Sequence, residues 1–287
     1  MIDSHCHLDL EPLKSRFPQL VQEAITAGVQ GFIVPGVHPD GWPGILALAA
    51  ENPRIMPALG IHPMHAGLVT DLVLDQLLEC SAQGIAIGET GLDTACAVPM
   101  ESQERAFRGQ IRVACKRGLP VLVHCRRAFQ RVLTILREEH AGQVGGIMHA
   151  FSGSVEMARE FIRLGFGISI SGTVTWNNAV KPLRVARELS LEHLVLETDA
   201  PDMTPERYRG RFNRSAWLTE TALKVAEIRG VPAEDIARIT SGNVRRILRL
   251  RGDFGVCDKF MGAIIKPLRD FPRSPPICYS VDCNEER

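Results

Sequence analysis

Four histidines and two acids in this sequence follow the ends of short apolar runs. They are His5, His7, Glu89, His124, His149 and Asp199. Imidazole nitrogen and carboxylate oxygen are the atoms with which proteins bind zinc, manganese and magnesium. Ionisable groups that gather in a partly buried place repel one another or stay unpaired unless a cation lies among them. If the fold brings these side chains together, they predict a divalent-metal centre.

His5 and His7 are two positions apart, so on a strand both rings lie on one face while Cys6 points to the other. A His-x-His pair taken alone is as typical of a structural role as of a metal site. One histidine at the end of a strand is more often structural. The joint occurrence of all six side chains is what favours metal binding.

The six donors exceed the needs of one tetrahedral ion, because a catalytic zinc takes three protein ligands and keeps one position open. We therefore expect two divalent ions, with zinc, magnesium and manganese all open. Glu89 is the expected shared ligand, because a carboxylate has two oxygens to offer and a neutral imidazole has one free nitrogen. The remaining expected ligands are His5, His7 and Asp199 for one ion, and His124 and His149 for the other.

Two ions about 3.5–4 Å apart lower the pKa of a shared water and neutralise the oxygens of a phosphoryl displacement. Glu89 and Asp199 are therefore the candidate catalytic residues. Asp199 is placed to take a proton from that water, although a role as ligand only is equally compatible.

The segment at residues 207–214 is basic and aromatic, and it follows the last apolar run. Guanidinium groups bind phosphate oxygens in pairs, and aromatic rings stack on nucleic-acid bases. The candidate substrate-binding residues are His62, Arg126, Tyr208, Arg209 and Arg211. A solvated basic loop is the alternative interpretation of this segment.

Eight short apolar runs alternate with segments of helical spacing, and these elements must position the site. The runs lie at residues 1–2, 31–34, 55–59, 85–87, 121–123, 146–148, 167–170 and 194–196. The segments between them lie at residues 13–27, 42–51, 70–83, 101–117, 128–140, 155–164 and 178–189. Apolar runs without polar alternation are typical of parallel strands covered on both faces.

Eight strand–helix units predict an α/β fold, a closed (β/α)8 TIM barrel in which all strands end at one mouth. An open doubly wound sheet is the alternative, but no Gly-x-Gly-x-x-Gly follows the first strand. Further helices at 215–229 and 232–250 are expected on the outside of the barrel. The expected division is a barrel at residues 1–250 and a poorly structured C-terminal tail at 251–287, where proline becomes frequent.

Glycines close several of the predicted helices. They are Gly28, Gly84, Gly118 and Gly165. Glycine readily adopts the left-handed conformation that ends a helix, so we expect that conformation at each position.

The chain carries 33 Lys plus Arg against 33 Asp plus Glu, and its formal net charge is zero. It therefore has no global field that attracts nucleic acid or an anionic membrane, and a polyanion must be bound locally. No run approaches the ~20 apolar residues that span a bilayer, and the N-terminus lacks the features of a signal peptide. The eight cysteines form no Cys-x-x-Cys pair. We expect a cytoplasmic, monomeric protein without membrane contact.

Short motifs occur in order along residues 1–250. They are Asp3-Ser4-His5-Cys6-His7-Leu8, Gly60-Ile61-His62-Pro63, Gly88-Glu89-Thr90-Gly91-Leu92-Asp93, Val123-His124-Cys125-Arg126, His149-Ala150-Phe151-Ser152-Gly153, Glu197-Thr198-Asp199-Ala200-Pro201 and Tyr208-Arg209-Gly210. Together they resemble the TatD family of metal-dependent hydrolases and deoxyribonucleases, within the amidohydrolase superfamily. The resemblance implies a barrel with a two-metal centre built from the same six ligands. It also implies 3'–5' exonuclease or related phosphodiesterase activity on DNA.

The chain departs from the family pattern in two loops. Members of the family usually have aromatic residues after Gly91-Leu92-Asp93, whereas this chain has Thr94-Ala95-Cys96-Ala97. The loop after the last strand usually reads Tyr-Arg-Gly-Lys-Arg-Asn-Glu-Pro, and Phe212 and Arg214-Ser215 differ from it. We expect the first difference to change the contacts made by its loop, and the second to affect the choice of substrate.

The sequence thus predicts a hydrolase that acts on a phosphodiester, with DNA or a small phosphodiester as its partner. An amidohydrolase or lactonase is the first alternative, because the same ions would activate water against a carbonyl carbon. A binding module that has lost reactivity is the second alternative, and the intact set of ligands disfavours it.

Overall fold

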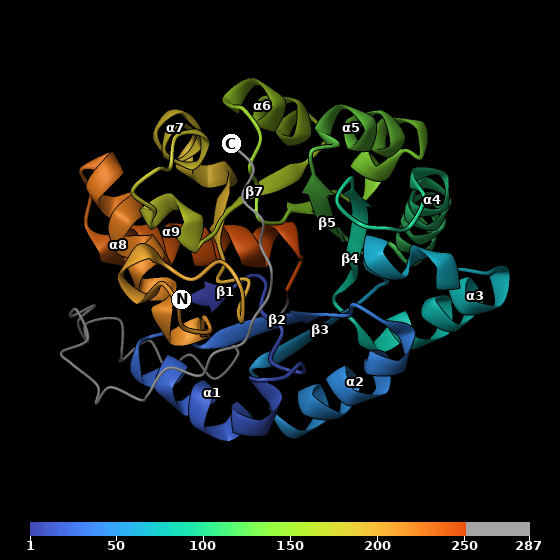
Figure 1. Cartoon of the computed structure of the whole chain (residues 1–287), viewed down its shortest axis with the longest axis horizontal. Coiled ribbons are helices and arrows are strands. Elements are labelled where there is room, and N and C mark those ends of the chain that lie inside the picture. The colour runs from blue at the N-terminus through green and yellow to red at the C-terminus, as the bar shows by residue number, and fades with distance from the viewer. Residues whose placement is uncertain (251–287) are drawn as a thin grey trace.

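The computed structural model describes residues 1–250, in which eight parallel strands form a barrel surrounded by helices (Figure 1). The strands are β1 (Ile2–Asp3), β2 (Gly31–Pro35), β3 (Ile55–Leu59), β4 (Ala86–Asp93), β5 (Val121–Arg126), β6 (Gly146–Met148), β7 (Phe166–Ile170) and β8 (Leu194–Leu196). Each strand pairs with the next one in the sequence. The chain after β1 closes the ring, because Ser4 N donates to Leu196 O at 3.0 Å and Asp199 N donates to His5 O at 2.9 Å. The predicted TIM barrel is confirmed, and the doubly wound alternative is wrong.

The helices follow the predicted segments closely. They are α1 (Phe17–Thr26), α2 (Trp42–Glu51), α3 (Asp71–Cys80), α4 (Met100–Arg117), α5 (Phe129–Glu138), α6 (Val155–Arg163), α7 (Lys181–Glu188), α8 (Leu218–Arg229) and α9 (Ala233–Ile247). The described part of the chain contains no helix with the length and apolar character needed to cross a membrane. The predicted tail at 251–287 lies outside the described residues.

Neighbouring residues of a strand belong to two different buried clusters. On β5, Val121 and Val123 pack with the surrounding helices. Leu122, between them, belongs to a second cluster that fills the barrel interior. Val244 of α9 and Leu248 just after it are part of this interior cluster. The expectation that α9 packs on the outside is therefore wrong, because α9 closes the interior at the end where the strands begin.

A register irregularity in β4 directs Glu89 into the barrel. Ile87 pairs with Val121, and Thr90 pairs with Val123, so three steps along β4 match two steps along β5. Both valines face the surrounding helices. One extra residue reverses the alternation of side chains at such a bulge. Glu89 consequently faces the interior together with the residues that end the other strands.

The glycines after the helices confirm the expectation of a left-handed conformation at three of four positions. Gly28, Gly118 and Gly165 have φ of 89°, 69° and 82°. Gly84 is extended, with φ of −94°, so the expectation is wrong there. A side chain at Gly84 would lie 3.3 Å from Pro57 O, and this close approach of β3 is the physical reason for glycine at that position.

Candidate metal centre

The carboxylate of Glu89, in the middle of β4, lies at the centre of a group of imidazoles. Its Oε2 lies 3.3 Å from His5 Nε2 and 3.6 Å from His7 Nε2. Its Oε1 lies 2.8 Å from His124 Nδ1 and 3.2 Å from His149 Nε2. Each oxygen of Glu89 thus faces its own pair of imidazoles.

Asp199, which follows β8, faces the first of these pairs. Its Oδ1 lies 3.7 Å from His5 Nε2 and 3.6 Å from His7 Nε2. Its φ of 55° lies in a region that residues other than glycine rarely adopt. Such strained backbone gathers at functional sites, where the surrounding structure holds it in place. The structure therefore brings together all six side chains that the sequence analysis selects as ligands.

Three groups of side chains have ligand atoms within 4.8 Å of one another among the described residues. They are His5, His7 and Asp199; His62, Glu89 and His124; and His5, His149 and Glu197. The donor atoms are nitrogen and oxygen alone, which suits a hard or borderline divalent cation. The first two groups share no residue. The donor set therefore fits divalent metal ions.

Burial and nearby charges shift the pKa values of the two carboxylates in opposite directions. Burial by itself raises the pKa of Glu89, but the imidazoles of His149 and His5 outweigh burial and hold that pKa well below its usual range. Burial also raises the pKa of Asp199, and His149 and His7 likewise outweigh it, so the net shift is downward. Both carboxylates are consequently ionised at neutral pH and available as ligands.

The pKa values of the imidazoles shift in different directions because their surroundings differ. Burial lowers the pKa of His7, but Asp199 and Glu89 outweigh burial and raise it to about 9. Burial, followed by the nearby charge of His149, lowers the pKa of His5. A divalent ion among these groups would balance the carboxylates without a protonated imidazole.

His62 lies inside the cluster rather than at its edge. The sequence predicts a substrate contact at this residue. In the structure His62 Nε2 lies 3.7 Å from Glu89 Oε1, and burial lowers the pKa of His62 to about 4. His62 Nδ1 accepts a hydrogen bond from Met64 N at 3.1 Å, so the neutral ring carries its proton on Nε2 and can donate to a substrate oxygen.

Two acids that were not among the predicted site residues contact His124 and His149. Each acid lies near the ring nitrogen that does not face Glu89. Asp93 Oδ2 lies 3.2 Å from His124 Nε2. Glu197 Oε1 lies 3.3 Å from His149 Nδ1 and accepts a hydrogen bond from Ala150 N at 2.6 Å. Acids in this position orient a ligating imidazole and make it more basic. The signal was present in the sequence, because Asp93 shares a motif with Glu89 and Glu197 shares a motif with Asp199.

The predicted substrate contacts lie in different surroundings. Arg126 is exposed beside His124 and lines a pocket at the mouth. Arg211 is exposed as well. The Arg209 guanidinium lies over the Trp176 ring, 4.7 Å from its centroid.

Tyr208 has less freedom to meet a substrate. Its ring stacks on Trp217 with centroids 4.1 Å apart, and its hydroxyl donates to Glu220 at 3.4 Å. One face of the Tyr208 ring is thus occupied within the protein.

A TIM barrel with histidines and acids gathered at the ends of its strands defines the class of metal-dependent hydrolases. Residues 2–249 match the family model described as TatD related DNase. The chain belongs to this family.

Relatives in bacteria support this assignment. The chain is 36% identical over 253 residues to "Uncharacterized metal-dependent hydrolase YabD" of Bacillus subtilis, an alignment that covers 87% of this chain and 99% of the relative. It is 34% identical over 247 residues to "Uncharacterized metal-dependent hydrolase YjjV" of Escherichia coli, with 84% and 95% covered. The crystal structure of YjjV, a TatD homologue, superposes with a TM-score of 0.83 at 33% identity and covers 88% of this chain and 98% of that one.

Proposed function

We propose that this protein is a deoxyribonuclease that uses two divalent ions, zinc, magnesium or manganese, to hydrolyse a phosphodiester near the 3' end of DNA. The observation that carries the proposal is the position of Glu89, whose Oε2 faces His5 and His7 while its Oε1 faces His124 and His149. A carboxylate between two sets of ligands suits a pair of ions. The family description, TatD related DNase, supports DNA as the substrate.

The proposed ligands divide between the two ions as follows. His5, His7 and Asp199 would hold one ion, His124 and His149 would hold the other, and Glu89 would be shared. When bound, a pair of ions supplies an activated water and neutralises charge on the phosphoryl oxygens.

The chain itself supplies the base and the contacts to the substrate. The Asp199 carboxylate accepts the proton of the attacking water, since its low pKa keeps it ionised. Arg126, Arg209 and Arg211 hold phosphate oxygens. His62 contacts the substrate from inside the cluster, and Tyr208 lines the same approach.

The test is a time course on end-labelled single-stranded and duplex oligonucleotides, with elemental analysis of the same purified protein. We expect stepwise shortening from the 3' end. Asp199→Asn should lower kcat by about 10²–10⁴-fold, the usual contribution of a general base. Glu227→Gln is the control, because this exposed side chain on α8 pairs only with Lys224 among the interactions described here. Turnover confined to a panel of lactones and cyclic amides would instead establish the carbonyl hydrolase and overturn the proposal.

A further inference from the structure

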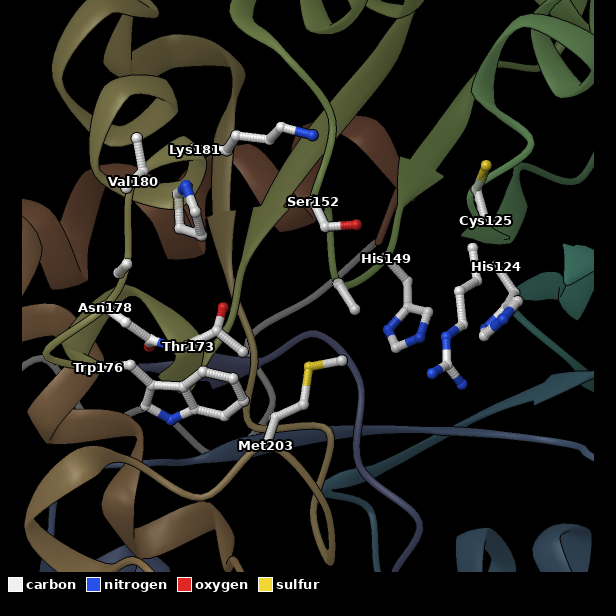
Figure 2. Close-up of a pocket in the computed structure, with 14 residues that line it drawn as sticks. His124, Cys125, His149, Ser152, Thr173, Trp176, Asn178, Val180, Lys181 and Met203 are labelled. Atoms are coloured by element: carbon white, nitrogen blue, oxygen red, sulfur yellow. The ribbon is translucent and has the colours of Figure 1, made fainter. Parts of the chain in front are cut away.

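A pocket of about 450 Å³ opens directly beside the histidine cluster. His124 and His149 form one side of it, and residues 176 and 178–182, at and before the start of α7, form the other (Figure 2). This volume lies within the range of roughly 300–1,000 Å³ that is typical of sites for small molecules. Whatever group occupies the pocket is therefore adjacent to the atoms held by the cluster.

The indole of Trp176 is a fixed aromatic surface in this pocket. Its Nε1 donates a hydrogen bond to Thr204 O at 2.9 Å, which fixes the plane of the ring. The Arg209 guanidinium covers one face, 4.7 Å from the ring centroid, and the indole still contributes to the pocket wall. A ring held in this way stacks on a planar ligand with little further loss of conformational freedom.

The remaining lining is rich in carbon and carries positive charge. Met203 and Val180 contribute apolar surface, and Figure 2 shows the Met203 side chain between Trp176 and His149. Arg126 follows His124 in sequence at the cluster side, and Lys181 comes from the opposite side. No acid is among the described residues that line the pocket. The ligand that suits this lining is planar, apolar on its faces and anionic at its ends.

We propose that the pocket is a subsite for one nucleotide, with its base stacked on Trp176 and its flanking phosphates bound near Arg126 and Lys181. This inference rests on the proposed function, since it places one nucleotide of a DNA chain next to the scissile phosphate. Stacking on an indole accepts every base, because each base has an aromatic face. The subsite therefore recognises the presence of a base without selecting its identity.

The test measures binding of thymidine 5'-monophosphate and of 2-deoxyribose 5-phosphate to the metal-loaded protein by titration calorimetry. The two probes share the phosphate and the sugar and differ only in the base. We expect the nucleotide to bind about tenfold or more tightly than the sugar phosphate, as a single stacked base usually provides. Trp176→Ala should remove this difference and leave binding of the sugar phosphate unchanged, while Trp176→Phe should restore most of it.

The charged side chains have a separate expected result. Lys181→Ala and Arg126→Ala should each weaken the binding of both probes by the same factor, because both probes carry the phosphate. Lys116→Ala, a change of an exposed lysine on α4, is the matched control and should alter neither affinity. Leu72→Ala, an apolar change at a side chain 68% exposed on α3, is the control for Trp176.

The outcomes distinguish this inference from the proposed function. If the protein does not cut DNA but its binding depends on the base and on Trp176, the subsite stands and the proposed function fails. If the protein cuts DNA while wild type binds both probes equally, or while Trp176→Ala weakens both equally, the subsite is wrong and the proposed function stands.

Discussion

Gln103 of α4 holds the backbone of Asp93 at the end of β4 by two hydrogen bonds. Its Oε1 accepts from Asp93 N at 2.8 Å, and its Nε2 donates to Asp93 O at 3.0 Å. The same amide nitrogen donates to Val98 O at 2.8 Å. Gln110, seven residues further along α4, binds Ile61 N and Ile61 O in the same way, at 2.7 and 3.0 Å. One buried helix face thus fixes both the acid behind His124 and the residue before His62.

Replacing Gln103 with leucine should destabilise the protein by about 1–3 kcal/mol, because it leaves the buried N–H of Asp93 without its partner, while the Asp93 carbonyl keeps the hydrogen bond from Cys96 N. The free energy of unfolding in urea measures this effect. Gln130→Leu makes the same chemical change at an exposed position of α5 and should have little effect. Equal stability of the two variants would show that the hydrogen bonds to Asp93 contribute nothing.

Replacing Asp93 with asparagine should weaken the binding of metal at His124. The carboxylate lies 3.2 Å from His124 Nε2, and loss of such a partner typically costs about 10–100-fold in metal affinity or activity. Competition with a chelating dye measures the affinity. The asparagine keeps the size of the side chain and an acceptor for Ala95 N, so the fold should be retained. A large loss of stability with unchanged affinity would instead make Asp93 a purely structural residue.

Much of the site was predictable because two simple regularities hold in this chain. Parallel strands present their ends at one mouth, and the apolar runs locate those ends. His149 follows its run directly, Asp199 follows its run after two residues, and both lie where the pattern predicts. These residues needed no information beyond the order of strands around the barrel.

Other features depend on packing that no local pattern specifies. The inward position of Glu89 depends on a bulge that appears only when β4 pairs with β5. The apolar face of α9 is visible in the sequence, but it does not reveal that Val244 packs inside the barrel. The hydrogen bonds between Gln103 and Asp93 depend on a tertiary contact, which no local pattern specifies. The sequence does carry one signal, a glutamine on the buried face of an amphipathic helix.

The stability of the protein should fall as the pH rises from about 4 to 7, because of Asp3. Burial raises the pKa of this carboxyl to about 7 from its usual 3.8, despite hydrogen bonds from Thr198 N and Oγ1. The folded state thus binds a proton that the unfolded state has released, and stability declines wherever the folded state holds more protons. Each unit of pKa difference corresponds to about 1.4 kcal/mol, so the loss reaches a few kcal/mol.

Urea unfolding at pH 5 and pH 8 measures this loss, and the Asp3→Asn variant should lose less stability than wild type over this range, because it lacks the contribution of Asp3. The variant keeps the size of the side chain, and it is neutral at both pH values. Asp75→Asn, at an exposed position of α3, is the control and should retain the slope of wild type. An unchanged slope in Asp3→Asn would assign the effect to other groups.

Removing single ligands should separate the two proposed ions. Glu89 presents Oε2 to His7 and Oε1 to His124, so these two histidines belong to different sets of ligands. Elemental analysis should find about two ions per chain in wild type, as in two-metal sites generally, and about one in His124→Ala and in His7→Ala. Glu89→Ala should lower the metal content below that of His124→Ala or His7→Ala, because the shared carboxylate serves both ions. His193 precedes β8 at the opposite end of the barrel, so the His193→Ala variant should retain both ions. If wild type held a single ion, or if His124→Ala lost as much metal as Glu89→Ala, the cluster would be one site, and the division of its ligands around Glu89 would be wrong.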